Sequence, residues 1–417
     1  MQRWARFSAA VLAACVLAAG CTEAQNGSLR SGREPQAPSS DTADVLELRQ
    51  RAEQGEADAQ FRLGVMNADG RGVPQNDAEA VRWYRLAADQ GDADAQVMLG
   101  LMYALGRGVP QNEAEAVRWY RLAVEQGNAD AQLNLGSMYG TGRGVPQSDA
   151  EAVRWYRLAA DQGNARAQTN LGVMYATGRG VPQNDAEAVR WYRLAAEQGD
   201  IGAQFNLGNM YRLGRGVPQN DAEAARWYRL AAEQGYAGAQ SNLAGMYALG
   251  RGVPQNDAEV LRWYRLAAEQ GDIGAQFNLG VLYGLGRGAP QNYAEAVRWY
   301  RLAAEQGNAR AQTNLGGMYY DGLGVTQSYA EAFRWYRLAA EQGYAGAQFL
   351  LGVMYDIGRG MPQDYVEAYK WYYIAAAAGD VDARQNRDRI IQRMTPAQIA
   401  EGQRRSAEWR PANGPQQ

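Results

Sequence analysis

Histidine is absent from the 417-residue sequence, and cysteine is scarce. Without histidine the chain lacks the commonest metal-ligating side chain and the commonest general base at neutral pH. Ser-His-Asp and Cys-His catalytic arrangements are therefore excluded, and no metal site has plausible ligands. The two cysteines are Cys15 and Cys21, and the first lies in an N-terminal leader. Removal of that leader leaves at most one thiol, so no internal disulfide is expected.

Lysine is almost absent as well, since Lys370 is the only one in the chain. The net charge is -3, and it becomes -5 when Arg3 and Arg6 are removed with the leader. The arginines recur at fixed spacings beside glutamates rather than forming a basic patch. This balance gives no reason to expect nucleic acid as a partner.

The N-terminus has the pattern of an export signal. Arg3 and Arg6 precede an apolar run, Phe7–Gly20, that is too short to predict a membrane-spanning helix, so residues 1–20 are interpreted as a secretory leader. The segment Leu17–Cys21 resembles the bacterial lipobox, although Ala18 stands where a larger aliphatic residue is usual. This resemblance implies that Cys21 is lipidated and anchors the protein to a membrane. A soluble periplasmic product and an uncleaved anchor are the alternatives.

Residues 21–40 have no apolar period and mix Ser, Gly, Pro and Gln with charge. Such a segment buries too little apolar surface to offset its ordering entropy, so we expect a disordered tether. The alternative is an arm that folds onto the rest of the chain. Residues 411–417 are expected to be a disordered tail.

The rest of the chain is organised by an internal repeat. The segment DAEAVRWYRLAADQG at 77–91 returns almost unchanged every 36 residues, and its Trp-Tyr pair recurs nine times between Trp83 and Tyr372. Tandem copies of this length are typical of a stacked array rather than a globular domain with one central core.

Each repeat contains two predicted helices. In the first copy, helix A covers Glu56–Asp69 and helix B covers Asp77–Gln90, with the loop GRGVPQN at 70–76 between them. Gly70 can adopt the left-handed conformation that ends helix A, and Pro74 prevents the helix from continuing. Asn76 followed by Glu79 predicts a capping box that starts helix B. The recurring Glu79, Arg82 and Arg85 are interpreted as a solvated ion-pair ladder.

The pattern A-x-A-Q-x-x-L-G-x-x-Y, then G-x-G-V-P, then A-x-x-W-Y-x-x-A-A-x-x-G resembles the Sel1-like repeat, a relative of the tetratricopeptide repeat. The resemblance covers residues 56–379. Departures are Asn67 for the helix A tyrosine, Ala244 for the helix A glycine, and an eighth loop with Leu323 and Thr326 in place of Arg and Pro. It implies an all-α fold, a right-handed αα superhelical solenoid of nine repeats that acts as an adaptor between proteins. A secreted branch of the family has disulfide-forming cysteines that this chain lacks, so the β-lactamase-like hydrolase activity suggested for that branch is not expected here.

Both ends of the array are expected to be capped by atypical helices, because a terminal repeat has a neighbour on one side only. Residues 41–55 follow the helix B pattern without its Trp-Tyr pair. Residues 380–410 are expected to form C-terminal capping helices, Val381–Met394 and Ala397–Trp409, with Trp409 covering the last repeat.

Comparison of the copies separates scaffold positions from variable ones. On a helical wheel at about 100° per residue, the nearly constant positions 59, 60, 63, 64, 66 and 67 share one arc. Positions 58, 61, 62, 65, 68 and 69 vary and share the other arc, which we expect to be free of packing constraints. In related repeats this face of helix A lines the concave groove that holds peptides, so the resemblance implies a ligand groove there. The predicted groove residues are Phe61, Val65, Asn134, Asn170, Phe205, Asn206, Asn209, Asn242, Phe277, Asn278, Asn314 and Phe349.

Two interpretations of these groove residues stay open. A row of amides could hydrogen-bond an extended peptide or glycan hydroxyls, or the asparagines could bridge neighbouring helices. The phenylalanines could contact a ligand or pack between repeats. The recurring loop arginines, of which Arg143, Arg179 and Arg215 are examples, could bind an acidic polymer, but nearby acidic residues favour local pairing.

The sequence therefore predicts a non-enzymatic scaffold or adaptor in the bacterial cell envelope that binds a protein or peptide in the helix A groove, with no metal and no cofactor. Its carboxylates belong to positions copied in every repeat, whereas catalytic sites are normally single. The predicted location is the periplasm, with the lipid in a membrane, the outer one favoured by Thr22 after the cysteine. The alternatives are a glycan-, peptidoglycan- or exopolysaccharide-associated lipoprotein and, less favoured, a secreted hydrolase.

Overall fold

A computed structural model describes residues 42–411, and this part of the chain is helical, without strands. The predicted leader, the lipidation residue Cys21, the tether and most of the C-terminal tail lie outside the described residues. None of the described helices is both long and apolar enough to cross a membrane. The expected all-α class is confirmed.

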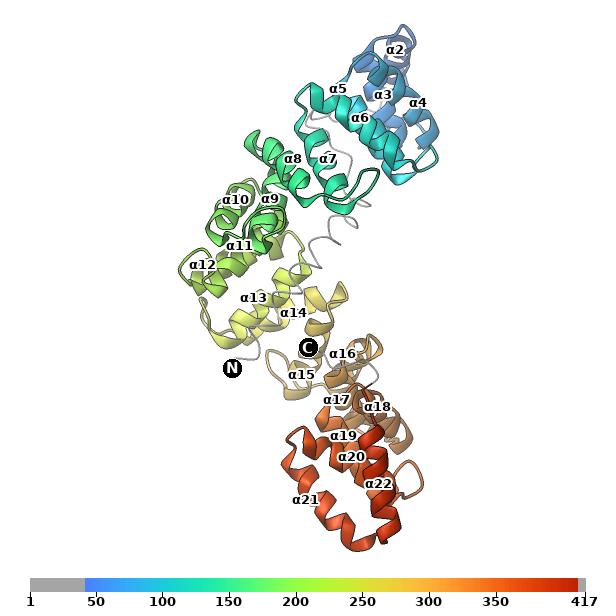
Figure 1. The fold of residues 1–417 in the computed structure, drawn as a ribbon, viewed down its shortest axis with the longest axis vertical. Helices are drawn as coiled ribbons and strands as arrows, with labels where there is room; N and C mark the ends of the chain where they lie inside the picture. Colours follow the sequence, from blue (N-terminus) through green and yellow to red (C-terminus); the bar gives the residue numbers. More distant parts are fainter. Residues whose placement is uncertain (1–41, 412–417) are drawn as a thin grey trace. The chain divides into compact units, whose positions relative to one another are not determined.

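The chain divides into two compact units, residues 1–220 and 221–417. Within each unit every helix packs against the next one along the chain, so that each unit is a solenoid of helix pairs (Figure 1). The helices of the first unit are α2 (Thr42–Glu53), α3 (Ala57–Asp69), α4 (Asp77–Asp89), α5 (Ala93–Leu105), α6 (Glu113–Glu125), α7 (Ala129–Thr141), α8 (Asp149–Asp161), α9 (Ala165–Thr177), α10 (Asp185–Glu197) and α11 (Ile201–Leu213).

The second unit continues the alternation. Its helices are α12 (Asp221–Glu233), α13 (Ala237–Leu249), α14 (Asp257–Glu269), α15 (Ile273–Leu285), α16 (Tyr293–Glu305), α17 (Ala309–Asp321), α18 (Tyr329–Glu341), α19 (Ala345–Ile357), α20 (Tyr365–Ala377), α21 (Val381–Ile390) and α22 (Pro396–Glu408), with a short 3₁₀ helix, η2 (Ile391–Arg393), between the last two. Helix A of the successive repeats is α3 and each odd-numbered helix to α19, and helix B is α4 and each even-numbered helix to α20.

The helix ends follow the expected capping chemistry, with one difference. Gly70 ends α3 in the left-handed conformation at φ 71°, as predicted. The Asn76 side chain accepts hydrogen bonds from the backbone N–H groups of Ala78 and Glu79 and so starts α4. The second hydrogen bond of the predicted capping box, from the Asn76 backbone N–H to the Glu79 carboxylate, does not form in α4. The Glu79 carboxylate instead accepts a hydrogen bond from Arg82, one turn further on. A complete capping box starts α22, between Thr395 and Gln398.

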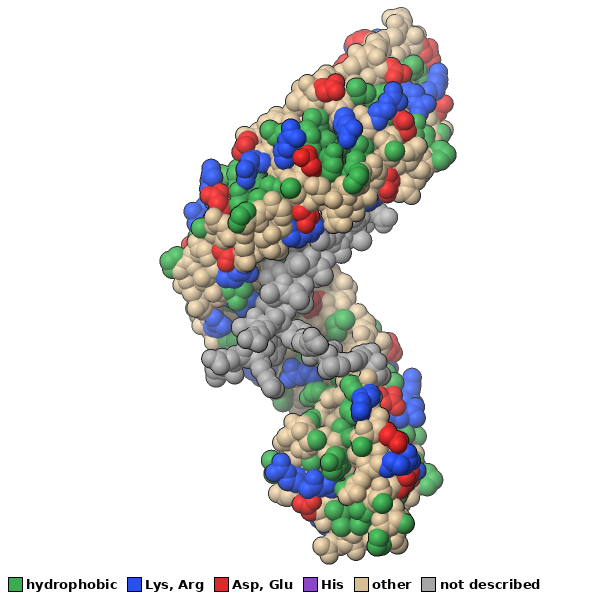
Figure 2. Space-filling view, in the orientation of Figure 1, with side chains coloured by type: hydrophobic (Ala, Val, Ile, Leu, Met, Phe, Trp, Pro, Cys, Tyr) green, Lys and Arg blue, Asp and Glu red, His purple; other side chains and the backbone are tan. Residues whose placement is uncertain are grey.

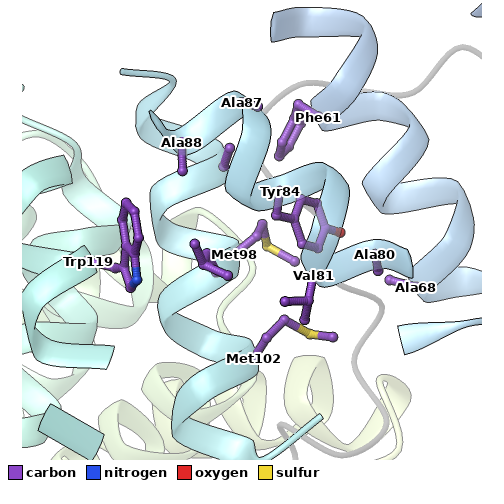
Figure 3. Packing of buried hydrophobic residues seen from close by; sticks show 12 residues of the cluster. Phe61, Ala68, Ala80, Val81, Tyr84, Ala87, Ala88, Met98, Met102 and Trp119 are labelled. Carbon is purple, nitrogen blue, oxygen red and sulfur yellow. The ribbon is translucent and has the colours of Figure 1, made fainter. Parts of the chain in front are cut away.

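The core consists of layers of small and aromatic side chains shared by neighbouring helices. In the first layers Tyr84 of α4 faces Phe61 of α3, and Met98 and Met102 of α5 lie against the other side of the cluster (Figure 3). Tyr84 is completely buried, as are the alanines that let the helices approach closely. Because each layer is repeated along the chain, the structure has a row of small cores rather than one large one.

Two kinds of glycine position mark a close approach of neighbouring segments, and the first repeats show one of each. A Cβ at Gly64 would lie 2.6 Å from the Tyr84 ring, so a side chain here would require the ring to shift. A Cβ at Gly108 would lie 2.2 Å from the Asp77 carbonyl oxygen. The contact between Gly108 and Asp77 places the loop of one repeat against the start of helix B in the preceding repeat.

The terminal helices cover the ends of the array. At the N-terminus α2 packs against α3 and buries Ala52 against Leu63 and Trp83. At the C-terminus α21 is shorter than the predicted helix to residue 394, because the chain tightens into η2 and reaches Thr395, which caps α22 before Pro396. Helix α22 packs on α20, and Trp409 contacts Trp371 edge-on with ring centroids 5.9 Å apart.

Candidate functional site

The predicted groove residues lie on helix A, but many of them also take part in packing. Phe61 is 3% exposed, with its ring 6.0 Å from the Tyr84 ring. Phe277 and Phe349 are half-buried and contact Tyr300 and Tyr372 in the same way. Phe205 is half-buried too. Phe61, Phe277 and Phe349 therefore fill the space between helix A and helix B of their own repeat, and ligand contact at their exposed edges stays a prediction.

The asparagine row divides into buried and half-buried members. Asn206 and Asn209 of α11 are 2% and 5% exposed. Such side chains do not face solvent, so this part of the variable arc is packed, contrary to the expectation that the whole arc is free of packing constraints. The half-buried asparagines, which keep part of their surface accessible, are Asn134, Asn170, Asn242, Asn278 and Asn314, and the predicted groove residue Val65 is half-buried as well.

One structural role of the row is to reach the buried tyrosines of the preceding repeat. The Asn314 side chain of α17 hydrogen-bonds the Tyr300 hydroxyl of α16, and Asn386 in the C-terminal cap does the same for Tyr372. In the first repeats the position facing Tyr84 is Met98, which cannot serve this purpose, and the Tyr84 hydroxyl is buried without a hydrogen-bond partner. Asn314 thus bridges two helices, which is the structural interpretation for this member of the row.

Burial governs the titration of these tyrosines. It raises the pKa of Tyr84, Tyr120 and Tyr192 in the first unit far above the usual value. The same desolvation raises the pKa of Tyr336 and Tyr372 in the second unit. Since the shift comes from burial and not from a charged catalytic neighbour, these groups are structural.

Most loop arginines are paired within the protein. From the second repeat on, the interhelix loop lies against the first residue of helix B in the preceding repeat, as when Arg179 contacts Asp149 at 2.6 Å and Arg215 contacts Asp185 at 2.7 Å. Arg143 pairs with Glu113 in the same position. Local pairing, which the sequence favoured, is therefore confirmed at these loops. The sequence did not predict that these ion pairs join one repeat to the preceding one.

Helix B also uses its charged side chains internally. Arg262 pairs with Glu259 one turn earlier and lies over the Trp263 ring, 4.6 Å from its centroid. Arg229, by contrast, hydrogen-bonds the Tyr247 hydroxyl of the next helix A at 2.8 Å. The predicted ladder is thus two separate contacts, an ion pair within helix B and a bridge between repeats. On the face that Figure 2 displays, basic and acidic side chains are interspersed.

The most exposed part of the helix A face was not among the predicted groove residues. Leu249 and Leu285, the last residues of α13 and α15, are 71% and 64% exposed. Each lies seven residues after an asparagine of the row, Asn242 and Asn278, and a spacing of seven returns to the same face of a helix. Both positions belong to the variable arc, where Leu105, Leu213 and Ile357 are also aliphatic and the remaining repeats have Asp or Thr, so an aliphatic residue at this position was the signal that could have identified them.

Residues 42–411 contain no group of three or more Cys, Asp or Glu side chains that could hold a metal ion. The described part of the helix A face therefore offers amides, aromatic edges and exposed aliphatic side chains. Such groups are able to form hydrogen bonds and apolar contacts with a ligand.

Comparison with known proteins agrees with this organisation. The model of the Sel1 repeat matches nine consecutive segments, 57–92, 93–128, 129–164, 165–200, 201–236, 237–272, 273–308, 309–344 and 345–380. The chain is similar to a protective antigen of uropathogenic Escherichia coli that displays an SLR fold, with 36% identity over 87% of this chain and 85% of that one and a TM-score of 0.53. It is also similar to a Sel1 repeat protein from Oxalobacter formigenes, with 35% identity over 78% of this chain and 97% of that one and a TM-score of 0.55. A search of curated proteins found no match.

Proposed function

Because the chain belongs to the Sel1 repeat family, whose solenoids are typical protein-interaction scaffolds and generally non-catalytic, we propose that it is a scaffold that binds a protein or peptide through the helix A face. Binding would be multivalent. Several weak contacts on successive helices are held in fixed register within each unit, so one partner can engage more than one repeat.

The contrast between the two helices is the observation that supports this proposal. Helix B commits its arginines to Glu, Trp and Tyr partners, as Arg262 and Arg229 illustrate. Helix A of the second unit instead presents half-buried Asn242 and Asn278 beside strongly exposed Leu249 and Leu285. Exposed aliphatic side chains next to amides are the chemistry that a peptide backbone and its apolar side chains require.

The proposed location is the bacterial cell envelope, with the mature chain in the periplasm and a lipid on Cys21 in the membrane, the outer one favoured. The support is the leader-like segment at residues 1–20 and the lipobox-like Leu17–Cys21. Replacing Cys21→Ser and fractionating cells tests this part alone. We expect the variant to leave the membrane fraction, and retention of the variant in the membrane would contradict it.

A glycan as the main ligand receives less support. The loop arginines that would bind an acidic polymer are engaged by carboxylates, as in the Arg215–Asp185 pair. Binding a polymer there would require breaking those pairs. No observation favours the hydrolase alternative.

The partner surface is tested with two matched pairs of leucines. Leu249→Asp with Leu285→Asp changes the helix A face of the second unit, and Leu266→Asp with Leu302→Asp places the same charges on helix B. All four leucines are exposed, so the folded structure should tolerate each pair, which circular dichroism would verify. We expect the helix A pair to lose capture of partners from envelope extracts and the helix B pair to retain it. Equal capture by both would mean that the partner binds elsewhere.

A further inference from the structure

The loop arginine of the ninth repeat, Arg359, lacks the carboxylate partner that loop arginines of earlier repeats have. In repeats two to seven this arginine forms an ion pair with the acidic residue that starts helix B of the preceding repeat. These pairs are Arg107–Asp77, Arg143–Glu113, Arg179–Asp149, Arg215–Asp185, Arg251–Asp221 and Arg287–Asp257. Helix α18, which precedes Arg359 in the same way, starts with Tyr329 instead. Arg359 has no ion pair within residues 42–411, where its one side-chain hydrogen bond goes to the Tyr320 hydroxyl.

Two tyrosine rings hold the Arg359 guanidinium in place. Its central carbon atom lies 5.5 Å from the ring centroid of Tyr320 and 5.2 Å from that of Tyr329. The two rings contact each other edge-on with centroids 5.1 Å apart, and they pack with Met361 against one apolar cluster. An arginine stacked on aromatic rings keeps its in-plane N–H groups available for hydrogen bonds. The rings thus fix the guanidinium without neutralising it.

The N–H groups of Arg359 that remain free are those that hold the carboxylate in other repeats. In the same unit, Nε and Nη2 of Arg287 donate to the two carboxylate oxygens of Asp257, at 3.4 and 2.7 Å. Arg359 donates from Nη1 to Tyr320, and its Nε and Nη2 have no acceptor among residues 42–411. Because Arg359 is exposed, another molecule can supply that acceptor.

A second arginine of this unit shows that stacking on tyrosine and binding a carboxylate are compatible. Arg393 of η2 lies over the Tyr365 ring, 4.5 Å from its centroid, and contacts the Asp356 carboxylate at 3.0 Å. Tyr365 and Asp356 stand one repeat after Tyr329 and Tyr320. The carboxylate that neutralises Arg393 thus comes from a position that carries a tyrosine, and no acid, one repeat earlier.

The neighbouring acid Asp321, at the end of α17, does not supply the missing carboxylate. Its counterpart in the first repeat, Asp69, pairs with Arg71 of the following loop, whereas the eighth loop has Leu323 in that place. Asp321 is exposed and forms no ion pair within the described part of the chain. Arg359 is therefore a positive charge without a paired acid, at a place where its surroundings are aromatic and apolar.

We propose that Arg359 binds an acidic side chain of a protein partner, whose carboxylate accepts hydrogen bonds from Nε and Nη2 beside Tyr320 and Tyr329. Charge complementarity selects the acid, and the apolar cluster behind the rings favours an acid carried by a peptide with apolar neighbours. The inference rests on the proposed scaffold function but uses a different surface. The titration below can therefore fail without affecting capture through Leu249 and Leu285.

The probe is acetyl-Ala-Glu-Ala-amide, which carries one carboxylate, and its matched control is acetyl-Ala-Gln-Ala-amide. Each peptide is titrated at constant ionic strength into the full-length mature protein, and the arginine Nε–H signals are followed by NMR. The signal that is missing from an Arg359→Leu variant, which copies Leu323 of the eighth loop, identifies Arg359. We expect saturable binding of the glutamate peptide with a dissociation constant on the order of 10 mM, and at least about tenfold weaker binding of the glutamine peptide.

Tyr329→Asp is the decisive variant, because it places at the start of α18 the acid that earlier repeats have. We expect the new carboxylate to pair with Arg359 and to weaken binding of the glutamate peptide at least about fivefold. The Arg359 Nε–H signal of this variant without peptide should already lie near the peptide-bound position of the parent, which loss of the ring alone would not produce.

Tyr293→Asp is the matched control for that variant. It places the same charge at the start of helix B one repeat earlier, where the next loop has Leu323 and no arginine. Salt screens a charge at this separation, so the dissociation constant of the glutamate peptide should change by less than about twofold. Circular dichroism verifies that each variant folds.

Several outcomes would overturn the proposal. It fails if the two peptides shift the Arg359 signal equally, if Tyr329→Asp binds the glutamate peptide like the parent, or if Tyr293→Asp weakens binding as much as Tyr329→Asp does. In Arg359→Leu the saturation-transfer signal of the glutamate peptide should disappear, and its persistence would also contradict the assignment. Glucuronate represents acidic glycans. We expect it to bind more weakly than the glutamate peptide, and equal or tighter binding would assign the site to a glycan instead of a protein.

Discussion

The Arg107 guanidinium contacts the Asp77 carboxylate through two hydrogen bonds, of 3.0 Å from Nε and 2.7 Å from Nη2. The contact joins the interhelix loop of the second repeat to the first residue of helix B in the first. An arginine with this two-point geometry holds the carboxylate in a fixed orientation. Similar contacts recur along both units, so the loops that have them are attached to the preceding repeat as well as to their own.

Breaking one such contact should weaken the junction between two repeats. In the Arg179–Asp149 pair the side chains are 27% and 31% exposed, so water screens the interaction only in part. We expect Arg179→Ala to lower the free energy of unfolding by about 1 kcal/mol. Urea unfolding followed by circular dichroism measures the change.

The eighth loop provides the control for this prediction. It has Leu323 in the arginine position, and the helix B it approaches begins with Tyr293 in place of the acid. Leu323→Arg alone should therefore bring no gain in stability, whereas Leu323→Arg with Tyr293→Asp should gain about as much as Arg179→Ala loses, about 1 kcal/mol. A gain from the single change would show that the arginine acts without the carboxylate.

Two buried tyrosines should respond differently to loss of the hydroxyl. The Tyr84 hydroxyl has no partner, whereas Asn314 hydrogen-bonds the Tyr300 hydroxyl. Tyr84→Phe should leave the free energy of unfolding unchanged or raise it, and Tyr300→Phe should lower it by about 1 kcal/mol, because only the second change removes a hydrogen bond. The denaturant midpoints of the two variants, each compared with that of the parent protein, measure these changes. Equal losses would contradict the assignment of Asn314 as a bridge.

A hydrogen bond between two glutamine side chains of one repeat makes a separate prediction. The Gln306 amide, just after helix B, donates to Gln276 Oε1 of helix A at 2.8 Å. Gln306→Ala leaves Gln276 Oε1 without its donor, so the free energy of unfolding should fall by about 1 kcal/mol. The neighbouring surface change Glu305→Ala serves as the reference and should stay within about 0.5 kcal/mol of the parent. A Gln306→Ala variant as stable as that reference would show that the pair contributes nothing.

Buried tyrosines should make the protein sensitive to alkali. Burial raises the pKa of Tyr84, Tyr120, Tyr192, Tyr336 and Tyr372. Below the unfolded tyrosine pKa of about 10, both states keep the proton and stability does not depend on these groups. Above it the unfolded chain ionises first, so stability falls by up to about 1.4 kcal/mol per pH unit and tyrosine until the folded value is reached.

Denaturant midpoints at pH 9 and pH 11 test this sign, with tyrosinate absorbance recorded in parallel. We expect the midpoint to drop steeply between these values and the ionisation of most tyrosines to coincide with unfolding. Full ionisation of the tyrosines in a protein that stays folded would contradict their burial.

Sequence periodicity predicted most of the fold, because the physical determinants are local. Gly70 ends helix A and Asn76 starts helix B through groups within a few residues of each helix end. The wheel also separated the scaffold side of helix A correctly, since Leu63 and Gly64 are buried there. What it could not supply was the packing between helices. Phe61 and Asn206 vary among copies and yet are buried, because neighbouring helices cover more of helix A than constancy of sequence indicates.

Other features depended on comparing residues across the array. The Arg179–Asp149 contact spans 30 residues, beyond any helical spacing, although the joint loss of Arg and Asp at Leu323 and Tyr293 was a usable signal. One exception in the last repeat, Ala378 where the other repeats have glutamine, gained a structural meaning only when Gln348 Oε1 was found without a hydrogen-bond partner.

Site-specific photo-crosslinking at two leucines of one repeat tests the proposed binding surface most directly. Leu285 ends helix A and Leu302 lies on helix B, and both are exposed. With a photoreactive residue at either position in cells, we predict that the Leu285 variant forms a discrete crosslinked complex with a protein partner and the Leu302 variant does not. Crosslinks of equal yield at both positions, or at Leu302 alone, would contradict binding through the helix A face.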